Sequence, residues 1–170
     1  DRRDGADLPG AEVATTSALS LYRAAHDATG EGDALTNLAS LQAATGRWAL
    51  ALRTGQDAVD AFARAHDDAG RGAALHNLGN LHARMGDLEQ AAALHRQARP
   101  LLGSRDDRMA SDLALADLLT LGGRPADALP LLDAALREAR PAERAALLHA
   151  RWQAERASGQ PETSRAAFLA

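Results

Sequence analysis

Apolar residues recur along this chain at the spacing of amphipathic helices. Leu75, Leu78 and Leu81 are three residues apart, which places them on one face of a helix. Gly86 follows as a residue suited to the left-handed conformation that ends a helix. Asp87 comes next, and its side chain can cap the helix after the turn. The pattern therefore predicts two helices joined by a short turn.

The same pattern recurs along the chain. Asn37 aligns with Asn77 at an offset of forty residues, and weaker copies follow towards the C-terminus. Each copy has a glycine at its predicted turn: Gly46, Gly86, Gly123 and Gly159. A repeat of this length is typical of solenoids, in which successive helix pairs stack and bury a continuous core. We therefore expect an all-α solenoid of antiparallel helix pairs, with about nine helices.

The alignment of the copies predicts where the repeats lie. Residues 11–29 align with the second helix of a repeat and form a half-repeat. Full repeats are expected at about 31–69, 71–102, 107–138 and 141–170, and residues 1–10 are expected to be a mobile segment. The half-repeat should expose some of its apolar residues, which are Val13, Leu19, Leu21 and Tyr22. We therefore expect the chain to be part of a larger protein.

Glycine pairs and one proline predict further breaks. Gly30 and Gly32 are predicted to form a short turn between repeats, and so are Gly70 and Gly72. Pro130 falls about one turn inside a predicted helix, so we expect a kink or a late helix start there.

Composition favours close helix packing and excludes several kinds of site. Hydrophobic residues make up 46% of the chain but aromatic residues only 3%, so small aliphatic side chains must fill the core. The absence of cysteine excludes disulfides and thiolate metal sites. The net charge of −4 gives no basic field that would favour nucleic acid or an anionic membrane. No apolar run approaches the roughly 20 residues of a membrane span, and the N-terminus lacks a signal-peptide core, so we expect a cytoplasmic protein.

Small residues recur where two helices would meet. They are Ala39, Gly79 and Ala116 in the predicted first helices. Together with the turn glycines, this pattern resembles the tetratricopeptide repeat from about residue 11 to the end of the chain. The resemblance implies a right-handed superhelix in which the first helices line a concave groove. Repeats extended to forty residues are similar to those of kinesin light chains and of large bacterial regulators that carry an ATPase module.

The resemblance also implies that polar residues of the first helices face the groove and bind a protein or peptide. Carried to this chain, the candidate binding residues are Asn37, Ser40, His76, Asn77, Asn80, Arg84, Asp117 and Gln153. Asn37 and Asn77 matter most, because an Asn amide can both donate to and accept from an extended peptide backbone. The alternative is that these residues only keep an exposed helix face solvated.

No arrangement of residues indicates catalysis, a metal or a cofactor. His26 and His66 are repeat equivalents, which favours a structural role at helix ends. His76 and His82 are six residues apart and should not share a helix face. His95 continues an apolar stripe, so we expect it to be packed rather than ligating. We therefore predict a protein that is not an enzyme and has no metal or cofactor.

Three functions fit the sequence. The first is a protein-interaction scaffold that binds a protein or peptide through the groove, with no nucleic acid or membrane partner. The second is a regulatory or self-assembly segment of a multidomain bacterial signalling or transcription regulator, in which the exposed solenoid ends would form a homo-oligomer. The third is an accessory domain of an enzyme whose catalytic part lies outside this chain.

Overall fold

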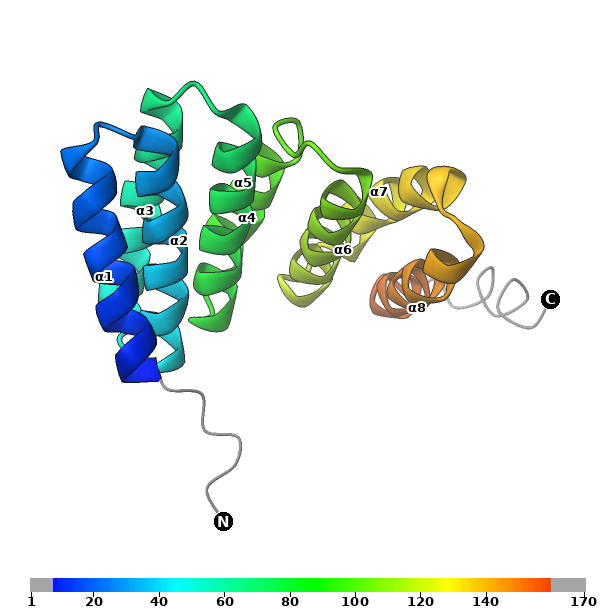
Figure 1. The fold of residues 1–170 in the computed structure, drawn as a ribbon. Coiled ribbons are helices and arrows are strands. Elements are labelled where there is room, and N and C mark those ends of the chain that lie inside the picture. The colour runs from blue at the N-terminus through cyan, green and yellow to red at the C-terminus, as the bar shows by residue number, and fades with distance from the viewer. Residues whose placement is uncertain (1–7, 160–170) are drawn as a thin grey trace, which may run out of the picture.

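The computed structural model of the chain describes residues 8–159 (Figure 1). The eight helices of this part are α1 (Leu8–Ala24), α2 (Ala28–Ala44), α3 (Trp48–Arg64), α4 (Asp68–Arg84), α5 (Leu88–Ala98), α6 (Arg105–Leu121), α7 (Pro125–Glu138) and α8 (Pro141–Ala157). All regular structure in these residues is helical, which confirms the expected all-α class. The ninth expected helix falls in residues 160–170, outside the described residues. Of the segment 1–10 that was predicted as mobile, residues 8–10 are the first residues of helix α1, and residues 1–7 lie outside the described residues.

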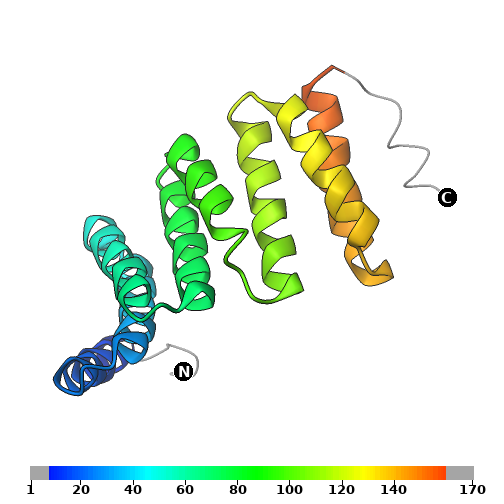
Figure 2. The ribbon, with the colours of Figure 1, turned by 90° about the horizontal axis from the view of Figure 1, so that it is seen from above.

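The helices stack as antiparallel pairs into a solenoid (Figures 1 and 2). Helices α2, α4, α6 and α8 are the first helices of their pairs, and α1, α3, α5 and α7 are second helices. Each first helix contacts the next first helix, whereas no two second helices of the described part bring Cα atoms within 8 Å of each other. The first helices therefore lie on the inside of the curve, and we call their inner side the first-helix face.

The turns inside the pairs have the geometry that their glycines predicted. The φ angles of these glycines lie between +75° and +83° at Gly46, Gly86, Gly123 and Gly159. This left-handed conformation costs least at glycine, which has no Cβ. After one of these turns Asp87 accepts a hydrogen bond from the backbone N–H of Gln90 at 3.3 Å and caps α5. The predicted turn and cap are both confirmed.

Two of the turns between pairs, from α1 to α2 and from α3 to α4, contain a histidine. His26 and His66 have φ angles of 55° and 54°, in the left-handed region. The aspartates that follow them, Asp27 and Asp67, cap α2 and α4 by accepting a hydrogen bond from the backbone N–H three residues later, at 2.9 and 2.8 Å. The repeat-equivalent histidines therefore lie at helix ends, as predicted.

The two glycine pairs predicted as turns between repeats lie inside α2 and α4, so that prediction is wrong. A Cβ on Gly30 would lie 2.3 Å from the ring of Tyr22, and a Cβ on Gly70 would lie 2.4 Å from the ring of Phe62. Both positions need glycine because an aromatic ring of the preceding second helix packs directly on the backbone. Gly30 and Gly70 therefore allow close packing between pairs, and His26 and His66, rather than these glycines, adopt the left-handed conformation of the turns.

Helix α7 runs from Pro125 to Glu138 and includes Pro130, so of the two alternatives expected there the late start is wrong and the kink stays a prediction. Pro125 occupies the first turn, where a missing N–H costs nothing. Pro130 removes only the hydrogen bond that would reach the carbonyl of Ala126. The side chain of Leu132 is 0% exposed, and this burial keeps the helix packed across the proline.

Small side chains let the helices of each pair approach closely. Ala39 and Ala116, at the small positions of α2 and α6, are 4% and 1% exposed. Gly79 holds this position in α4, and a Cβ there would lie 3.0 Å from the ring of His95 on α5. His95 is fully buried, which confirms that it is packed.

Helix α1 exposes apolar residues, as expected of a half-repeat. Val13 and Leu21 are 68% and 71% exposed, and Tyr22 is 38% exposed. Leu19, the fourth candidate, is instead buried in the core that α1 shares with the next helices.

Candidate functional site

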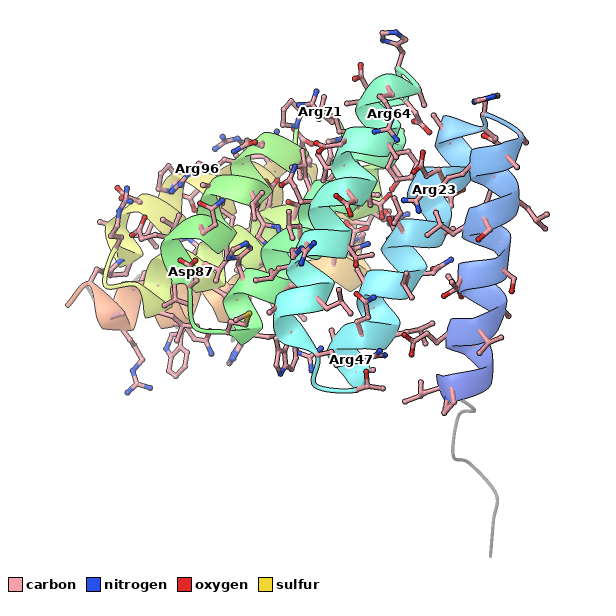
Figure 3. All side chains as sticks on the ribbon, turned by 90° about the vertical axis from the view of Figure 1, so that its left-hand side faces the viewer. Arg23, Arg47, Arg64, Arg71, Asp87 and Arg96 are labelled. Atoms are coloured by element: carbon pink, nitrogen blue, oxygen red, sulfur yellow. The ribbon has the colours of Figure 1, made fainter. Side chains whose placement is uncertain are left out.

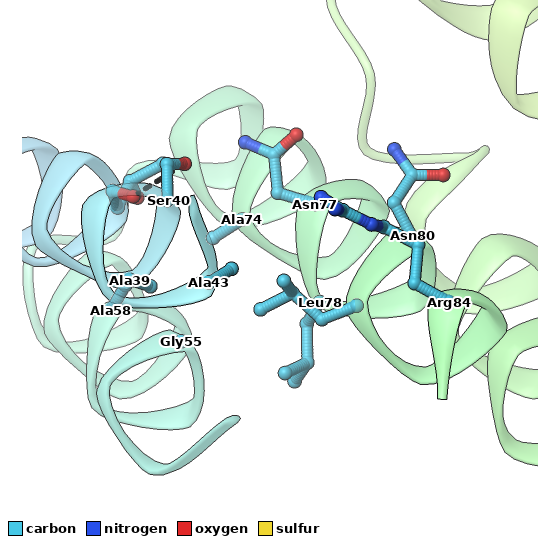
Figure 4. Close-up of a pocket in the computed structure, with 12 residues that line it drawn as sticks. Ala39, Ser40, Ala43, Gly55, Ala58, Ala74, Asn77, Leu78, Asn80 and Arg84 are labelled. Carbon is cyan, nitrogen blue, oxygen red and sulfur yellow. Dashed lines mark hydrogen bonds between the residues drawn. The ribbon is translucent and has the colours of Figure 1, made fainter. Parts of the chain in front are cut away.

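A hollow of about 160 Å³ opens on the first-helix face between α2 and α4 (Figure 4). We call it the α2–α4 hollow. Its floor consists of small and aliphatic residues, namely Ala39, Ala43, Gly55, Ala58, Ala74, Leu78 and Leu81. Its polar lining consists of Thr36, Ser40, Asn77, Asn80 and Arg84. The hollow reaches down to α3 because Gly55 and Ala58 have little or no side chain to fill the space.

The two asparagine amides of the polar lining are available for hydrogen bonds to a ligand. Ser40 donates its hydroxyl to the Thr36 carbonyl of its own helix at 3.1 Å. Asn77 and Asn80 stand on the open side above Leu78 (Figure 4), and within residues 8–159 neither side chain makes an internal hydrogen bond. Their amides can therefore donate to and accept from a bound backbone.

Arg84 is the one charged residue among those that line the α2–α4 hollow. Its guanidinium carbon lies 4.7 Å from the ring centroid of Trp48, at the start of α3. Stacking on an indole face attracts the cation and restricts where the side chain points. The hollow therefore combines an apolar floor with a positioned positive charge.

A second hollow of about 310 Å³ lies between α4 and α6, and we call it the α4–α6 hollow. It is lined by Ala73, His76, Asn77, Leu102, Asp107 and Ala110. Asn77 lines both hollows, so its amide stands between them. Burial lowers the pKa of His76, and the nearby carboxylate of Asp107 opposes that shift.

His76 meets a second histidine, His95, at this hollow, and burial keeps both rings neutral near pH 7. Burial, followed by the neighbouring His76 ring, lowers the pKa of His95 to about 4. The two rings meet edge to face with centroids 4.9 Å apart. His95 Nδ1 lies 3.2 Å from the Ser111 hydroxyl of α6, so the ring also joins α5 to the next pair. Near neutral pH this junction carries no imidazolium charge.

The remaining predicted residues lie on first helices but line neither hollow. Asn37 is exposed on α2 at the position equivalent to Asn77. Asp117 lies on α6, where partial burial of its carboxyl raises the pKa and the nearby His149 opposes the shift. The amide nitrogen of Gln153 lies 2.9 Å from His149 Nε2 on α8. The structure thus brings Ser40, His76, Asn77, Asn80 and Arg84 together and leaves Asn37, Asp117 and Gln153 outside the hollows.

Sequence reasoning missed part of each hollow. Leu102 and Asp107 come from the segment after α5 and the start of α6, where the forty-residue offset no longer applies. Gly55 contributes to the floor of the α2–α4 hollow because it has no side chain to fill the space. The signal that could have revealed the floor is the nearby small residue Ala58, since two small residues on a second helix leave space beneath the groove.

Two other kinds of functional feature, a metal site and a membrane-spanning helix, are absent from the described residues. Among them, no group of three or more histidine, aspartate or glutamate side chains could hold a metal ion. None of the helices between residues 8 and 159 is both long enough and apolar enough to cross a membrane.

The sequence model of the tetratricopeptide repeat family matches residues 30–104, which hold α3 to α5 and nearly all of α2. Residues 30–104 are tetratricopeptide repeats. No curated protein sequence matches the chain. The two hollows lie mainly on these tetratricopeptide repeats, with part of the α4–α6 hollow supplied by the start of α6.

Solved structures share the fold along nearly the whole chain. One is the crystal structure of nearly identical TPR-like repeats of a putative kinesin light chain from Podosopora anserina. It has a TM-score of 0.78 and 19% sequence identity, over 95% of this chain and 83% of that one. A crystal structure of a single-substitution variant of the same repeats has a TM-score of 0.77 and 20% identity, with the same two coverages. At this identity the likeness concerns the fold, so the tetratricopeptide-type solenoid extends beyond residues 30–104.

Tetratricopeptide repeats and this solenoid fold support a protein-interaction scaffold. A stack of helix pairs offers an extended face rather than a deep catalytic cleft. Such solenoids are typically non-catalytic.

Proposed function

We propose that this protein is a scaffold that binds an extended peptide segment of a partner protein along its first-helix face. The observation that carries the proposal is the position of Asn77, whose exposed amide stands between two hollows of about 160 and 310 Å³. Asn80 and Ser40 add further hydrogen-bonding groups next to the first hollow.

An extended peptide suits this arrangement. Successive side chains of an extended strand point to opposite sides, so every second residue faces the same surface. Asn77 would bond the backbone of one peptide unit, and the side chains on either side of that unit would enter the two hollows. A cavity of about 150 Å³ can hold a benzene-sized molecule, so the α2–α4 hollow has room for one apolar side chain.

The chemistry of the two hollows differs. The α2–α4 hollow has an apolar floor with Arg84 at its edge. The α4–α6 hollow has the carboxylate of Asp107 and the neutral ring of His76. A bound segment would therefore place an apolar side chain in the first hollow and a hydrogen-bond donor in the second.

Selection of peptides tests the proposal. A random-peptide phage library is selected on the immobilised 170-residue chain, and enriched peptides are measured by fluorescence anisotropy. Asn77→Ala should weaken binding by about threefold to tenfold, as expected for one lost hydrogen bond. Gln97→Ala, an exposed amide on the second helix α5, is the matched control and should bind like the wild type.

Nuclear magnetic resonance gives an independent readout. The chain has three asparagines, at positions 37, 77 and 80, so their side-chain amide signals are easy to assign by mutation. Bound peptide should shift the Asn77 amide signals more than those of Asn37. Peptides that bind Asn77→Ala as tightly as wild type, or that shift only second-helix signals, would show that the first-helix face is not the binding surface.

A further inference from the structure

Several carboxylates at the junctions between helices are paired with arginine. Glu31 of α2 pairs with Arg23 and Arg64 at 2.8 and 2.7 Å, and Figure 3 shows these two arginines towards the same end of the stack. Glu12 of α1 pairs with Arg47, which Figure 3 shows towards the opposite end. The helix junctions of this solenoid therefore match carboxylates with guanidinium groups.

The α4–α6 hollow has a carboxylate without such a partner. Asp106 and Asp107 are neighbours in the first turn of α6. Asp106 pairs with Arg140 at 2.6 Å. Asp107 accepts a hydrogen bond from the Ser104 hydroxyl at 2.6 Å but forms no ion pair with an arginine of residues 8–159. Asp107 is therefore an exposed carboxylate whose charge no neighbouring arginine balances.

The next pair of helices shows what a carboxylate at this position binds. Asp107 is the third residue of α6, and Glu143 is the third residue of α8. Arg105, the first residue of α6, donates two hydrogen bonds to Glu143 at 2.9 and 3.0 Å. The first residue of α4 is Asp68. For Asp107, the preceding first helix thus has a second carboxylate where Glu143 finds a guanidinium.

The hollow lies where an aromatic ring packs in the earlier pairs. The third residue of α4 is Gly70, and the ring of Phe62 packs on it; α2 has the same arrangement. In α6 the third residue is Asp107, and the residue forty positions after Phe62 is Leu102. Leu102 and Asp107 both line the α4–α6 hollow. The place that a ring fills in the earlier pairs is therefore bordered here by an aliphatic side chain and a carboxylate.

The polar groups that line the α4–α6 hollow can all accept hydrogen bonds, and none is a basic residue that stays charged. Asn77 has its amide oxygen and Asp107 its carboxylate. Burial lowers the pKa of His76, and its Nδ1 is buried without a partner in the described residues. A neutral imidazole keeps one ring nitrogen as an acceptor. The apolar part of the lining consists of Ala73, Leu102 and Ala110.

We propose that the bound segment carries a lysine or arginine whose cation pairs with Asp107 in the α4–α6 hollow. This inference rests on the proposed function, because the basic side chain belongs to the peptide that the first-helix face binds. The methylene stem would lie on the apolar lining while the charged end donates to the carboxylate. The cation would take the role at Asp107 that Arg105 has at Glu143. With about 310 Å³, against about 160 Å³ for the α2–α4 hollow, this hollow has room for a long side chain.

The opposite charges of the two hollows fix the direction in which the segment binds. Arg84 lines the α2–α4 hollow, which has no acidic residue in its lining. A basic side chain placed there would meet a like charge, whereas in the α4–α6 hollow it meets Asp107. Repulsion at one hollow and attraction at the other discriminate between the two directions. The apolar residue of the segment therefore enters the α2–α4 hollow and the basic residue enters the α4–α6 hollow.

The peptides selected on the wild-type chain test this inference. They should share a lysine or arginine at a fixed distance from an apolar residue. Asp107→Asn, which keeps an acceptor for the Ser104 hydroxyl, should weaken their binding by about fivefold at low salt and by less at high salt. Asp106→Asn, in the same turn of α6, is the matched control and should bind like wild type. Circular dichroism checks that both variants are folded.

A double-mutant cycle assigns the pairing to the two charges. Norleucine in place of the peptide's basic residue should weaken binding to wild type by a similar factor, and Asp107→Asn should then cause no further loss. A library selected on Asp107→Arg should instead favour an acidic residue at this place in the peptide. Losses that multiply in the cycle, or peptides without a shared basic residue, would overturn the inference.

The Asn77 variant separates this inference from the proposed function. Peptides that lose affinity with Asn77→Ala but not with Asp107→Asn would overturn the basic-residue pairing and leave the proposed function intact. Peptides that need Asp107 but not Asn77 would support the pairing and contradict the proposed role of the Asn77 amide. A library that yields no binder would overturn both.

Discussion

Lowering the pH should destabilise the junction between α5 and α6 through His95. The folded protein holds the pKa of this ring at about 4, mainly by burial, whereas the ordinary value is 6.5. Between these two values the unfolded chain binds a proton that the folded chain does not, so stability falls as pH falls. Each unit of pH below 6.5 costs about 1.4 kcal/mol, so the loss reaches about 2 kcal/mol near pH 5.

Urea unfolding followed by circular dichroism measures this loss. The free energy of unfolding is compared near pH 7 and near pH 5 for wild type and for His95→Leu. The variant should lose most of the pH dependence, even if it is less stable overall because Ser111 loses its partner. His149→Gln, which removes an exposed histidine of α8, is the control and should keep the wild-type dependence.

The pH window separates the effect of the histidines from that of the carboxylates. The hydrogen bond from Arg105 holds the pKa of Glu143 at about 2, and that of Glu31 is also lowered by its arginine partners. These carboxylates contribute stability that is lost only as pH falls below their ordinary pKa of 4.5. His76, next to His95, also has a lowered pKa and adds a loss of the same sign. If wild type and His95→Leu show the same change in unfolding free energy between about pH 7 and pH 5, burial of a neutral His95 is wrong.

Three further substitutions test the packing. Gly79→Leu should lower the unfolding free energy by about 1–3 kcal/mol in urea unfolding, because even a Cβ there lies 3.0 Å from the His95 ring; an unchanged melting temperature would contradict this. Asp67→Ala should cost about 1 kcal/mol, since it removes the acceptor that caps α4 through the Gly70 N–H; stability equal to wild type would mean that the cap contributes nothing. Leu132→Ala should cost about 2–5 kcal/mol by thermal or urea unfolding, because the side chain is 0% exposed; a loss well below 1 kcal/mol would show that α7 repacks freely around the cavity.

Much of the fold follows from local chemistry along the sequence. Helix periodicity, the turn glycines and Asp87 concern residues within a few positions of one another, and the structure has them as predicted. The small residues Ala39 and Ala116 were also recognisable, because close helix contact excludes larger side chains. Repetition strengthened each of these inferences, since the same pattern recurs at a fixed offset.

Only part of the candidate site could be predicted from the sequence. Residues on one helix face, such as Asn77, Asn80 and Arg84, follow from the helical period. The hollows beneath them depend on which side chains of α3 and α6 are small or absent, as at Gly55, and on how the segment after α5 places Asp107. That placement joins elements whose spacing departs from the forty-residue repeat, so no offset along the chain could reveal it.

The sequence by itself determined that this chain is a helical solenoid, where each pair turns, and which helix faces are apolar, because these properties depend on nearest neighbours and on a repeated period. Tertiary structure decided the roles of Gly30 and Gly70, which lie under aromatic rings of the preceding helix and not in turns. It also decided that His95 is buried and neutral. These outcomes depend on which helix lies against which. Two glycines with the same neighbours in sequence can serve a turn or a close contact, and only the packing partner separates the two.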